Sequence, residues 1–128
     1  MLTAQDVLRR YLDEELPDFV DRPLTDVNMV GRFGSTPLHV AAVRGDAEEI
    51  RALIEGGADV NAEGELRNRP IHDAIGQQNV EAVRLLLDAG ARLDGINEFG
   101  KSTCGMAMES GNQAIIDLIR SRCAGAEG

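Results

Sequence analysis

The chain has 128 residues, a size that fits a single domain with a continuous buried core. Its 22 acidic residues against 13 basic ones give a formal net charge of -9, which disfavours nucleic-acid binding and docking on anionic membranes. The same acidity favours association with a basic partner, although it also serves solubility. With three Phe, one Tyr and no Trp, the core must consist of aliphatic side chains, Ala and Met.

The first predicted element is a helix of about twelve residues close to the N-terminus. Thr3 is a candidate N-cap with Asp6 as an early acidic partner, and one apolar stripe follows at Val7, Leu8, Tyr11 and Leu12. Pro17 is expected to end the helix, after which Phe19, Val20 and Leu24 can pack inward. We interpret residues 1–30 as a divergent cap whose polar outer face is formed by Asp13, Glu14, Glu15, Asp18 and Asp21.

From residue 31 onward the sequence repeats every 33 residues. Thr36-Pro37-Leu38-His39 aligns with Arg69-Pro70-Ile71-His72, and Gly57-Ala58-Asp59-Val60-Asn61 aligns with Gly90-Ala91-Arg92-Leu93-Asp94. The offset predicts repeats over 31–63 and 64–96 and a C-terminal capping repeat over 97–128. In that last unit Ser102-Thr103-Cys104-Gly105 replaces the tetrad, so its first helix is weakly specified.

Each unit is predicted to hold two helices. A proline in the first helical turn favours short helices over 36–43 and 70–76, and Gly45 breaks the first of them. Apolar residues at helical spacing predict second helices over 47–55, 80–88 and 113–122. Gly56, Gly57 and Gly90 are expected to stop the second helices.

The longest run, Gly34-x-Thr36-Pro37-Leu38-His39-x-Ala41-Ala42-x-x-Gly45-Asp46 with the later Gly57-Ala58-Asp59-Val60-Asn61-Ala62, resembles an ankyrin repeat. The resemblance covers about three quarters of the chain. It implies an all-α solenoid of stacked helix-turn-helix pairs, with β-hairpin-like fingers and divergent capping units at both ends. It also implies non-catalytic binding of a partner protein through the concave face and the finger tips.

No catalytic, metal-binding or cofactor-binding residues are predicted. His39 and His72 are the only histidines, one repeat apart and therefore too distant to share a metal ion. The resemblance implies that they hydrogen-bond the turn before their helix and the neighbouring repeat. Cys104 has no histidine in its unit, so we interpret it as a buried small side chain, with a disulfide to Cys123 as an alternative.

Partner-binding positions follow from the register of the resemblance. They are Val30, Arg32, Phe33, Ser35, Val43, Arg44, Glu65, Leu66, Asn68, Gln77, Ile96, Glu98, Phe99, Lys101 and Glu109. Phe33, Leu66 and Phe99 are spaced by 33 residues each, so they are expected to form an apolar row along one edge, which is typical of a protein-binding site. Alternatively, these side chains pack from finger to finger and only stiffen the hairpins.

The specific functional hypothesis is an acidic inhibitor or immunity-type protein that neutralises a basic enzyme or toxin. The alternatives are an adaptor or scaffold that bridges two proteins, an accessory of a larger assembly, and an enzyme of unrecognised type. No nucleic-acid or membrane partner is expected. The absence of a signal-peptide pattern and of a disulfide framework predicts a cytoplasmic protein with both cysteines reduced. The free protein is expected to be a monomer.

Overall fold

The computed structural model describes residues 2–17, 19 and 26–127, with side chains described up to residue 122. The elements within these ranges are α1 Ala4–Asp13, α2 Pro37–Arg44, α3 Ala47–Glu55, the 3-10 turn η1 Glu65–Arg67, α4 Pro70–Gly76, α5 Val80–Asp88, α6 Thr103–Ser110 and α7 Gln113–Glu127. The helices predicted from the sequence therefore all form, and the last one extends five residues beyond its expected end at residue 122.

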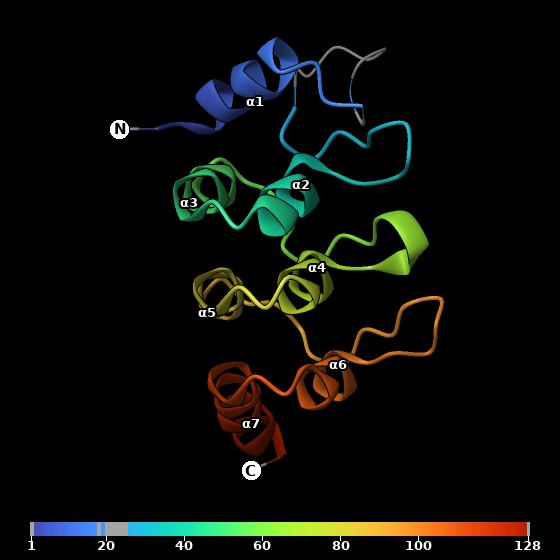
Figure 1. Ribbon diagram of the computed structural model, residues 1–128. Coiled ribbons are helices and arrows are strands. Elements are labelled where there is room, and N and C mark those ends of the chain that lie inside the picture. Colours follow the sequence, from blue (N-terminus) through green and yellow to red (C-terminus); the bar gives the residue numbers. More distant parts are fainter. Residues whose placement is uncertain (1, 18, 20–25, 128) are drawn as a thin grey trace.

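The helices stack in layers of two, as Figure 1 shows. The first helices of the layers, α2, α4 and α6, lie in one column, and the second helices, α3, α5 and α7, lie in the other. Pro37, Pro70 and Thr103 begin the first column at intervals of 33 residues. The chain is thus an all-α solenoid of the expected kind, with α1 covering one end of the stack against α3.

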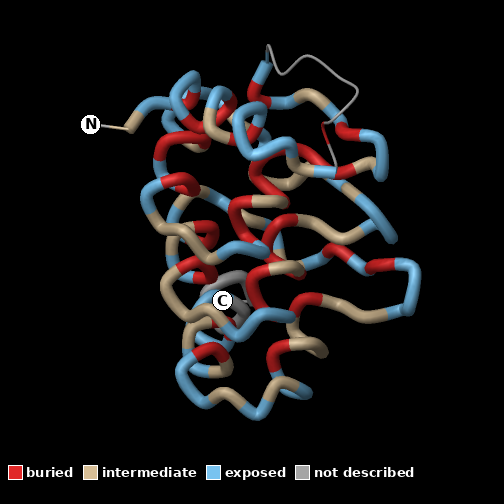
Figure 2. Tube along the Cα trace, turned by 45° about the horizontal axis from the view of Figure 1, so that its top comes forward, coloured by how far each residue is buried: buried red, intermediate tan, exposed pale blue. Residues whose placement is uncertain are grey.

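The core lies where the layers meet, and each layer depends on its neighbours to bury its apolar faces (Figure 2). Ala41, Ala74 and Ala107 occupy one slot of α2, α4 and α6 and are fully buried. Their small side chains let successive helices approach closely. Larger aliphatic residues complete the interior at Leu38, Ile50, Leu53, Ile71, Ile75, Val83, Leu86, Ile115 and Ile119.

The first helix begins as predicted and ends earlier than predicted. The Thr3 hydroxyl accepts a hydrogen bond from the Asp6 amide at 3.2 Å, and the Asp6 carboxylate accepts one from the Thr3 amide at 3.0 Å. The helix stops at Asp13, and Glu15 then adopts a positive φ of 50°. Pro17 therefore does not set the end of α1, which was expected about two residues later.

Phe19, beyond the end of α1, adds an aromatic ring to the interior of the cap. The ring packs inward as expected and is stacked on Tyr11 with 6.4 Å between ring centroids. Val20, Leu24, Asp18 and Asp21, which the sequence assigns to the same cap, lie outside the described residues.

Two neighbouring glycines at the end of α3 have different tasks. Gly57 has a φ of +98° and turns the chain, as the sequence predicts. Gly56 has a negative φ, and a Cβ atom at that position would lie 2.4 Å from the Cβ of Ala4. Gly56 therefore permits the close approach of α1 to the end of α3.

Three fingers project from the stack between the helix pairs (Figure 1). Each is closed by a short backbone hydrogen bond: from Gly31 to Ser35 at 2.8 Å, from Gly64 to Asn68 at 2.7 Å, and from Asn97 to Lys101 at 3.0 Å. Among the described residues the fingers contain no extended β-strand, and their β-pairing consists of one isolated antiparallel bridge between Ile96 and Ser102. The fingers are hairpin-like, as expected.

Neighbouring fingers and loops are also bonded to one another. The Glu65 amide donates to the Ser35 hydroxyl at 3.3 Å, and the Glu98 amide donates to the Leu66 carbonyl at 2.9 Å. These bonds hold the fingers in one row. Across the described part of the chain, no helix has the length and apolar content needed to cross a membrane.

Candidate functional site

A groove runs between the fingers and the first helices, and the middle repeat forms its centre. One part of the groove, with a volume of about 320 Å³, lies between the first two fingers, with Val40 and Val43 of α2 among its lining residues. The next part continues toward α6 and includes Phe99 and Met106. Asn68 and Asp73 line both parts, so the two hollows form one continuous surface.

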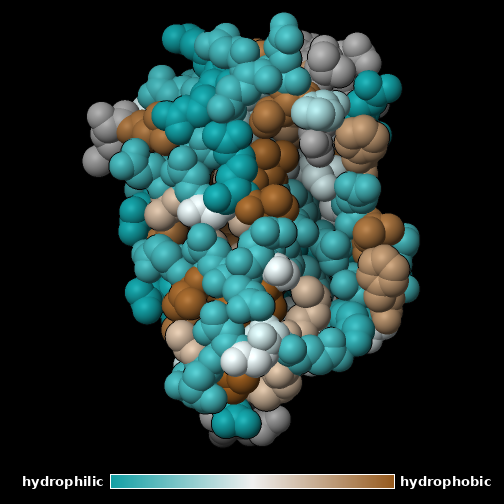
Figure 3. All heavy atoms as spheres, in the orientation of Figure 1, coloured by the Kyte–Doolittle hydropathy of each residue, from teal (hydrophilic) through white to brown (hydrophobic). Residues whose placement is uncertain are grey.

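The rim of this groove is apolar. Phe33, Leu66 and Phe99 are exposed to 49%, 42% and 66%, so a large part of each side chain is open to solvent while the remainder packs within the chain. The edge formed by the fingers accordingly shows brown and tan spheres in Figure 3. Further exposed apolar side chains lie at Val30, Val43, Ile96 and Met108. An exposed row of this kind next to a groove is typical of a surface that binds another protein.

The histidine side chains are used to build the groove. The Thr36 amide donates to Nδ1 of His39 at 3.1 Å, so this nitrogen carries no proton. The proton is therefore on Nε2, which donates to the Asn68 carbonyl of the next finger at 2.9 Å. His39 thus joins the turn before its own helix to the neighbouring repeat, which confirms the structural role that the resemblance implied.

His72 repeats this arrangement one layer further along. Its Nδ1 accepts from the Arg69 amide at 3.0 Å, and its Nε2 lies 3.2 Å from the Gly95 carbonyl. Burial is the main cause that lowers the pKa of His72 below its usual value, and the charge of Arg69 acts in the same direction. Both histidines are consequently neutral hydrogen-bonding residues that join each turn to the next repeat.

Asp73 lines the groove but is not among the binding residues predicted from the sequence. It lies on α4 in the slot that Val40 fills on α2 and Met106 fills on α6. Its carboxylate has no hydrogen bond or ion pair with any described side chain, although Lys101 and Arg69 are in the same region. Burial, followed by repulsion from Glu65, raises the pKa of Asp73 to about 7. A signal was available in the sequence, since an acid stands where the other two repeats have apolar residues.

The nearby cations are already paired with other acids. The ammonium of Lys101 lies 2.7 Å from Glu109 Oε1, and the Arg69 guanidinium lies 3.3 Å from Asp94 Oδ1. Asp73 therefore lies at the centre of the groove as a partly buried acid without a counter-ion among the described residues.

Some residues predicted to contact a partner already have tasks within the chain. Ser35 is buried and accepts a hydrogen bond from the next finger. The Asn68 side chain accepts from Asn97 at 3.0 Å, and Lys101 holds Glu109. The following predicted residues are exposed, whether or not they also have a contact within the chain: Val30, Arg32, Phe33, Val43, Glu65, Leu66, Gln77, Ile96, Glu98, Phe99 and Glu109.

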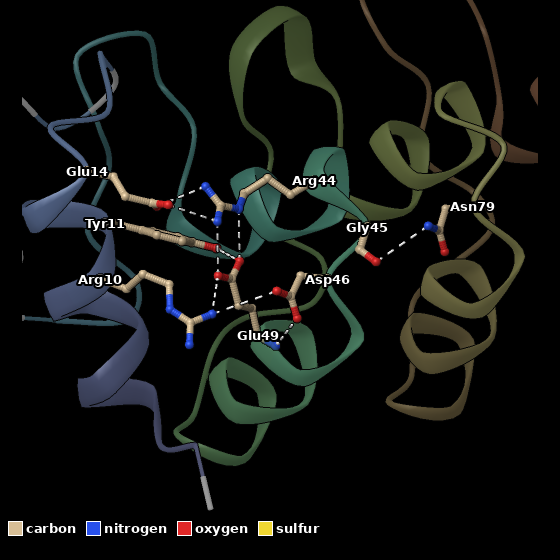
Figure 4. A network of polar contacts seen from close by, with 8 residues as sticks. All are labelled: Arg10, Tyr11, Glu14, Arg44, Gly45, Asp46, Glu49 and Asn79. Carbon is tan, nitrogen blue, oxygen red and sulfur yellow. Dashed lines mark hydrogen bonds and ion pairs between the residues drawn. The ribbon is translucent and has the colours of Figure 1, made fainter.

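Arg44 belongs to a second polar cluster, between the first helix and the first repeat (Figure 4). At its centre the fully buried Glu49 accepts hydrogen bonds from Arg10 at 2.8 Å and from the Tyr11 hydroxyl at 2.7 Å. Arg44 Nε lies 3.1 Å from Glu49, and its terminal nitrogens bond Glu14. Glu14 thus faces α2 and does not lie on the outer face of the cap, where the sequence predicts it.

The polar groups of this second cluster are hydrogen-bonded or ion-paired to one another. Burial, and then the hydrogen bond to Glu49, raise the pKa of Tyr11 above its usual value, so its hydroxyl stays protonated and donates. Each oxygen of Glu49 has at least one donor. Such a network fastens α1 to the first repeat and has no open coordination for a ligand.

The described residues contain no group of three or more His, Cys, Asp or Glu side chains placed to hold a metal ion. Cys104 lies half-buried against the core on α6. The side chain of Cys123, and with it the alternative of a disulfide between the two cysteines, lies outside the described residues.

Stacked helix pairs, hairpin fingers and a groove with an apolar rim define a repeat solenoid of the protein-binding class. A family model for three copies of ankyrin repeats matches residues 5–97, and the chain belongs to the ankyrin-repeat family. The matched range begins within α1, at residue 5, and ends before α6. Comparison with curated proteins gives no match. Ankyrin repeats generally mediate protein–protein interactions and are typically non-catalytic modules.

Proposed function

We propose that this protein is a non-catalytic module that binds a partner protein in the groove and against the rim of finger residues. The observation that supports this most is the row of Phe33, Leu66 and Phe99, three large apolar side chains exposed beside a continuous groove. Burial of such side chains by a partner would remove their apolar area from water, at about 25 cal/mol per Å² before the costs of association.

In its specific form, the proposal is that the protein inhibits a basic enzyme or toxin by covering it. The net charge of -9 supports this form, because an acidic surface steers a basic partner toward the groove. We propose no catalysis by this chain, because His39 and His72 are committed to turns and neighbouring fingers. We further propose that the protein is cytoplasmic and monomeric when free, as expected from the sequence.

The test is capture of partners with the protein and two sets of variants. Phe33→Ser, Leu66→Ser and Phe99→Ser, combined in one protein, remove the apolar rim. Leu12→Ser is the matched control, because Leu12 is also 42% exposed but lies on α1, outside the groove.

We expect the wild-type protein and the Leu12→Ser control to retain one basic protein whose activity is abolished on binding. The triple variant should fold normally and lose that protein. Equal capture by the triple variant would contradict the proposed binding surface. Simultaneous retention of two partners, both still active, would favour an adaptor over an inhibitor.

A further inference from the structure

The middle repeat contains several residues that stabilise its fold less well than their counterparts do. Asp73 occupies a slot that is apolar in the other two repeats. Leu66 and Arg67 have φ values of +59° and +60°, although the Arg67 slot holds Gly34 and Gly100 in the other fingers. Left-handed backbone is unfavourable for residues with a Cβ atom, and most for branched ones.

The turn after α4 shows the same pattern. Gln78 has a φ of +55°, whereas the equivalent positions are Gly45 and Gly111, with φ values of +70° and +69°. Of these residues Leu66, Asp73 and Gln78 border the hollows along the first helices. Strained or unpaired residues that gather at one surface of an otherwise regular scaffold are expected at a functional site.

We propose that Asp73 determines the specificity of the groove by accepting the ammonium or guanidinium group of a Lys or Arg side chain from an extended segment of the partner protein. Apolar residues that flank this cation in the partner rest on Leu66 and Phe99. This inference depends on the proposed function, since it specifies which side chain of the partner protein the same groove binds.

The charges around Asp73 fit a cation from outside. Glu65, on the middle finger, is exposed and is the charged neighbour whose repulsion acts on Asp73. On the α6 side, Glu109 is held by Lys101. His39 and His72 use their ring nitrogens for the turns and neighbouring fingers. A cation that enters the groove therefore meets two carboxylates, Asp73 and Glu65, while Lys101, which lines the same hollow, is paired with Glu109.

The walls of the groove favour a long basic side chain over a small ion. Val40 and Met106 line the hollows on either side of Asp73 and can contact the methylene stem of a Lys or Arg residue. A metal ion would need more ligands than Asp73 and Glu65, and no group of three such residues exists in the described part of the chain. A charge-assisted hydrogen bond to Asp73 would also give the segment a fixed register.

The experiment is selection from a random nine-residue peptide library displayed on phage, with the full-length protein as bait. Three baits are compared: wild type, Asp73→Asn, and Asp117→Asn as the matched control. Asp117 loses the same charge but lies on α7, where its carboxylate accepts from Gln113 of the same helix. A fourth bait, Asp73→Lys, reverses the charge.

We expect wild type and Asp117→Asn to enrich peptides with a Lys or Arg flanked by apolar residues. These peptides should bind Asp73→Asn at least about tenfold more weakly, as loss of one partner of a desolvated charge pair predicts. Asp73→Lys should enrich acidic peptides instead. Circular dichroism of each bait checks that the fold is intact.

Two results would overturn the inference. Peptides that require Leu66 and Phe99 but show no basic preference and bind Asp73→Asn equally would leave the proposed function standing without Asp73. Basic peptides that are weakened by Glu65→Gln and not by Asp73→Asn would assign recognition to Glu65. Selection of the same peptides by a Leu66→Ser/Phe99→Ser bait would instead contradict the proposed function itself.

Discussion

Two acidic residues stand at repeat positions where the other units have apolar side chains. The carboxylate of one has a full set of hydrogen-bond partners, and that of the other has none among the described residues. Glu49 shares its slot with Ala82 and Ile115, is fully buried, and is bonded by Arg10, Tyr11 and Arg44. Asp73 shares its slot with Val40 and Met106 and has no cation or donor from the described part of the chain.

This difference in partners indicates that Glu49 stabilises the fold, whereas Asp73 is available to bind a ligand. A buried charge with a full set of partners holds two elements together, whereas a partly buried charge without partners costs stability until something binds it. The N-terminal cluster therefore fastens the cap, and the groove keeps an acid available for a ligand. Substitutions in the N-terminal cluster and in the middle repeat test this difference, and the largest change in stability is expected for Glu49.

Glu49→Ala should destabilise the protein by about 3–5 kcal/mol, because it leaves Arg10, Arg44 and the Tyr11 hydroxyl without their common acceptor. Urea unfolding followed by circular dichroism measures the change. Glu48→Ala is the control, since Glu48 lies on the same helix outside the cluster. A similar small loss for both variants would show that the cluster does not fasten α1.

His72→Ala should cost about 2–3 kcal/mol at pH 8, because the turn before α4 and the Gly95 carbonyl both lose their partner. The pKa of His72 is lowered in the folded state, so the unfolded chain takes up a proton first. The stability that His72 contributes is therefore present above pH 6.5 and is lost as the pH falls below it. An Asp73→Asn background, which removes the opposing titration, makes this loss visible in urea unfolding at pH 5 and pH 8.

Asp73→Asn should stabilise the protein at pH 8 by about 2 kcal/mol. A shift of the Asp73 pKa from 3.8 to about 7 corresponds to roughly 4 kcal/mol, and partial solvent exposure reduces this value. Because the folded-state pKa is raised, the penalty is absent near pH 4 and grows as the pH rises to about 7. Unfolding at pH 4, 6 and 8 would measure it. A destabilising effect at pH 8 would mean that the carboxylate has a stabilising partner after all.

Gln78→Gly should stabilise the protein by about 0.5–1 kcal/mol, because glycine adopts a φ of +55° without steric cost. Gly111→Ala is the reciprocal change at the equivalent turn, where φ is +69°, and should destabilise by a similar amount. Thermal unfolding is sensitive enough for both. Equal and opposite changes would confirm that the middle repeat holds a strained residue where its neighbours do not.

The sequence predicts the repeat and its helices well because these depend on local signals. Proline in the first turn, glycine after the second helix and a 33-residue offset each act within one unit, and all of the predicted helices form. The end of α1 was misplaced because the turn at Glu15 has no strong local signal in the sequence. The hairpin form of the fingers came from the resemblance.

The roles of Glu49 and Asp73 could not be predicted in the same way. Comparison of slots marks both as unusual, but only the fold shows that Arg10 and Tyr11 of α1 reach Glu49 while Asp73 has no equivalent neighbour among the described residues. The same holds for Ser35 and Arg44, which the register placed on the binding surface and which bond within the chain. Hydrogen bonds and ion pairs between different units of the chain cannot be predicted from the sequence pattern within one repeat.

The most direct measurement is the affinity of a selected basic peptide for the wild-type protein and for Asp73→Asn between about pH 6 and pH 8. With a pKa of about 7, the ionised fraction of Asp73 rises roughly tenfold over this range, so wild-type affinity should rise by about the same factor. The Asp73→Asn profile should be flat. Identical pH profiles for the two proteins would contradict the claim that the acid at the centre of the groove is kept for recognition.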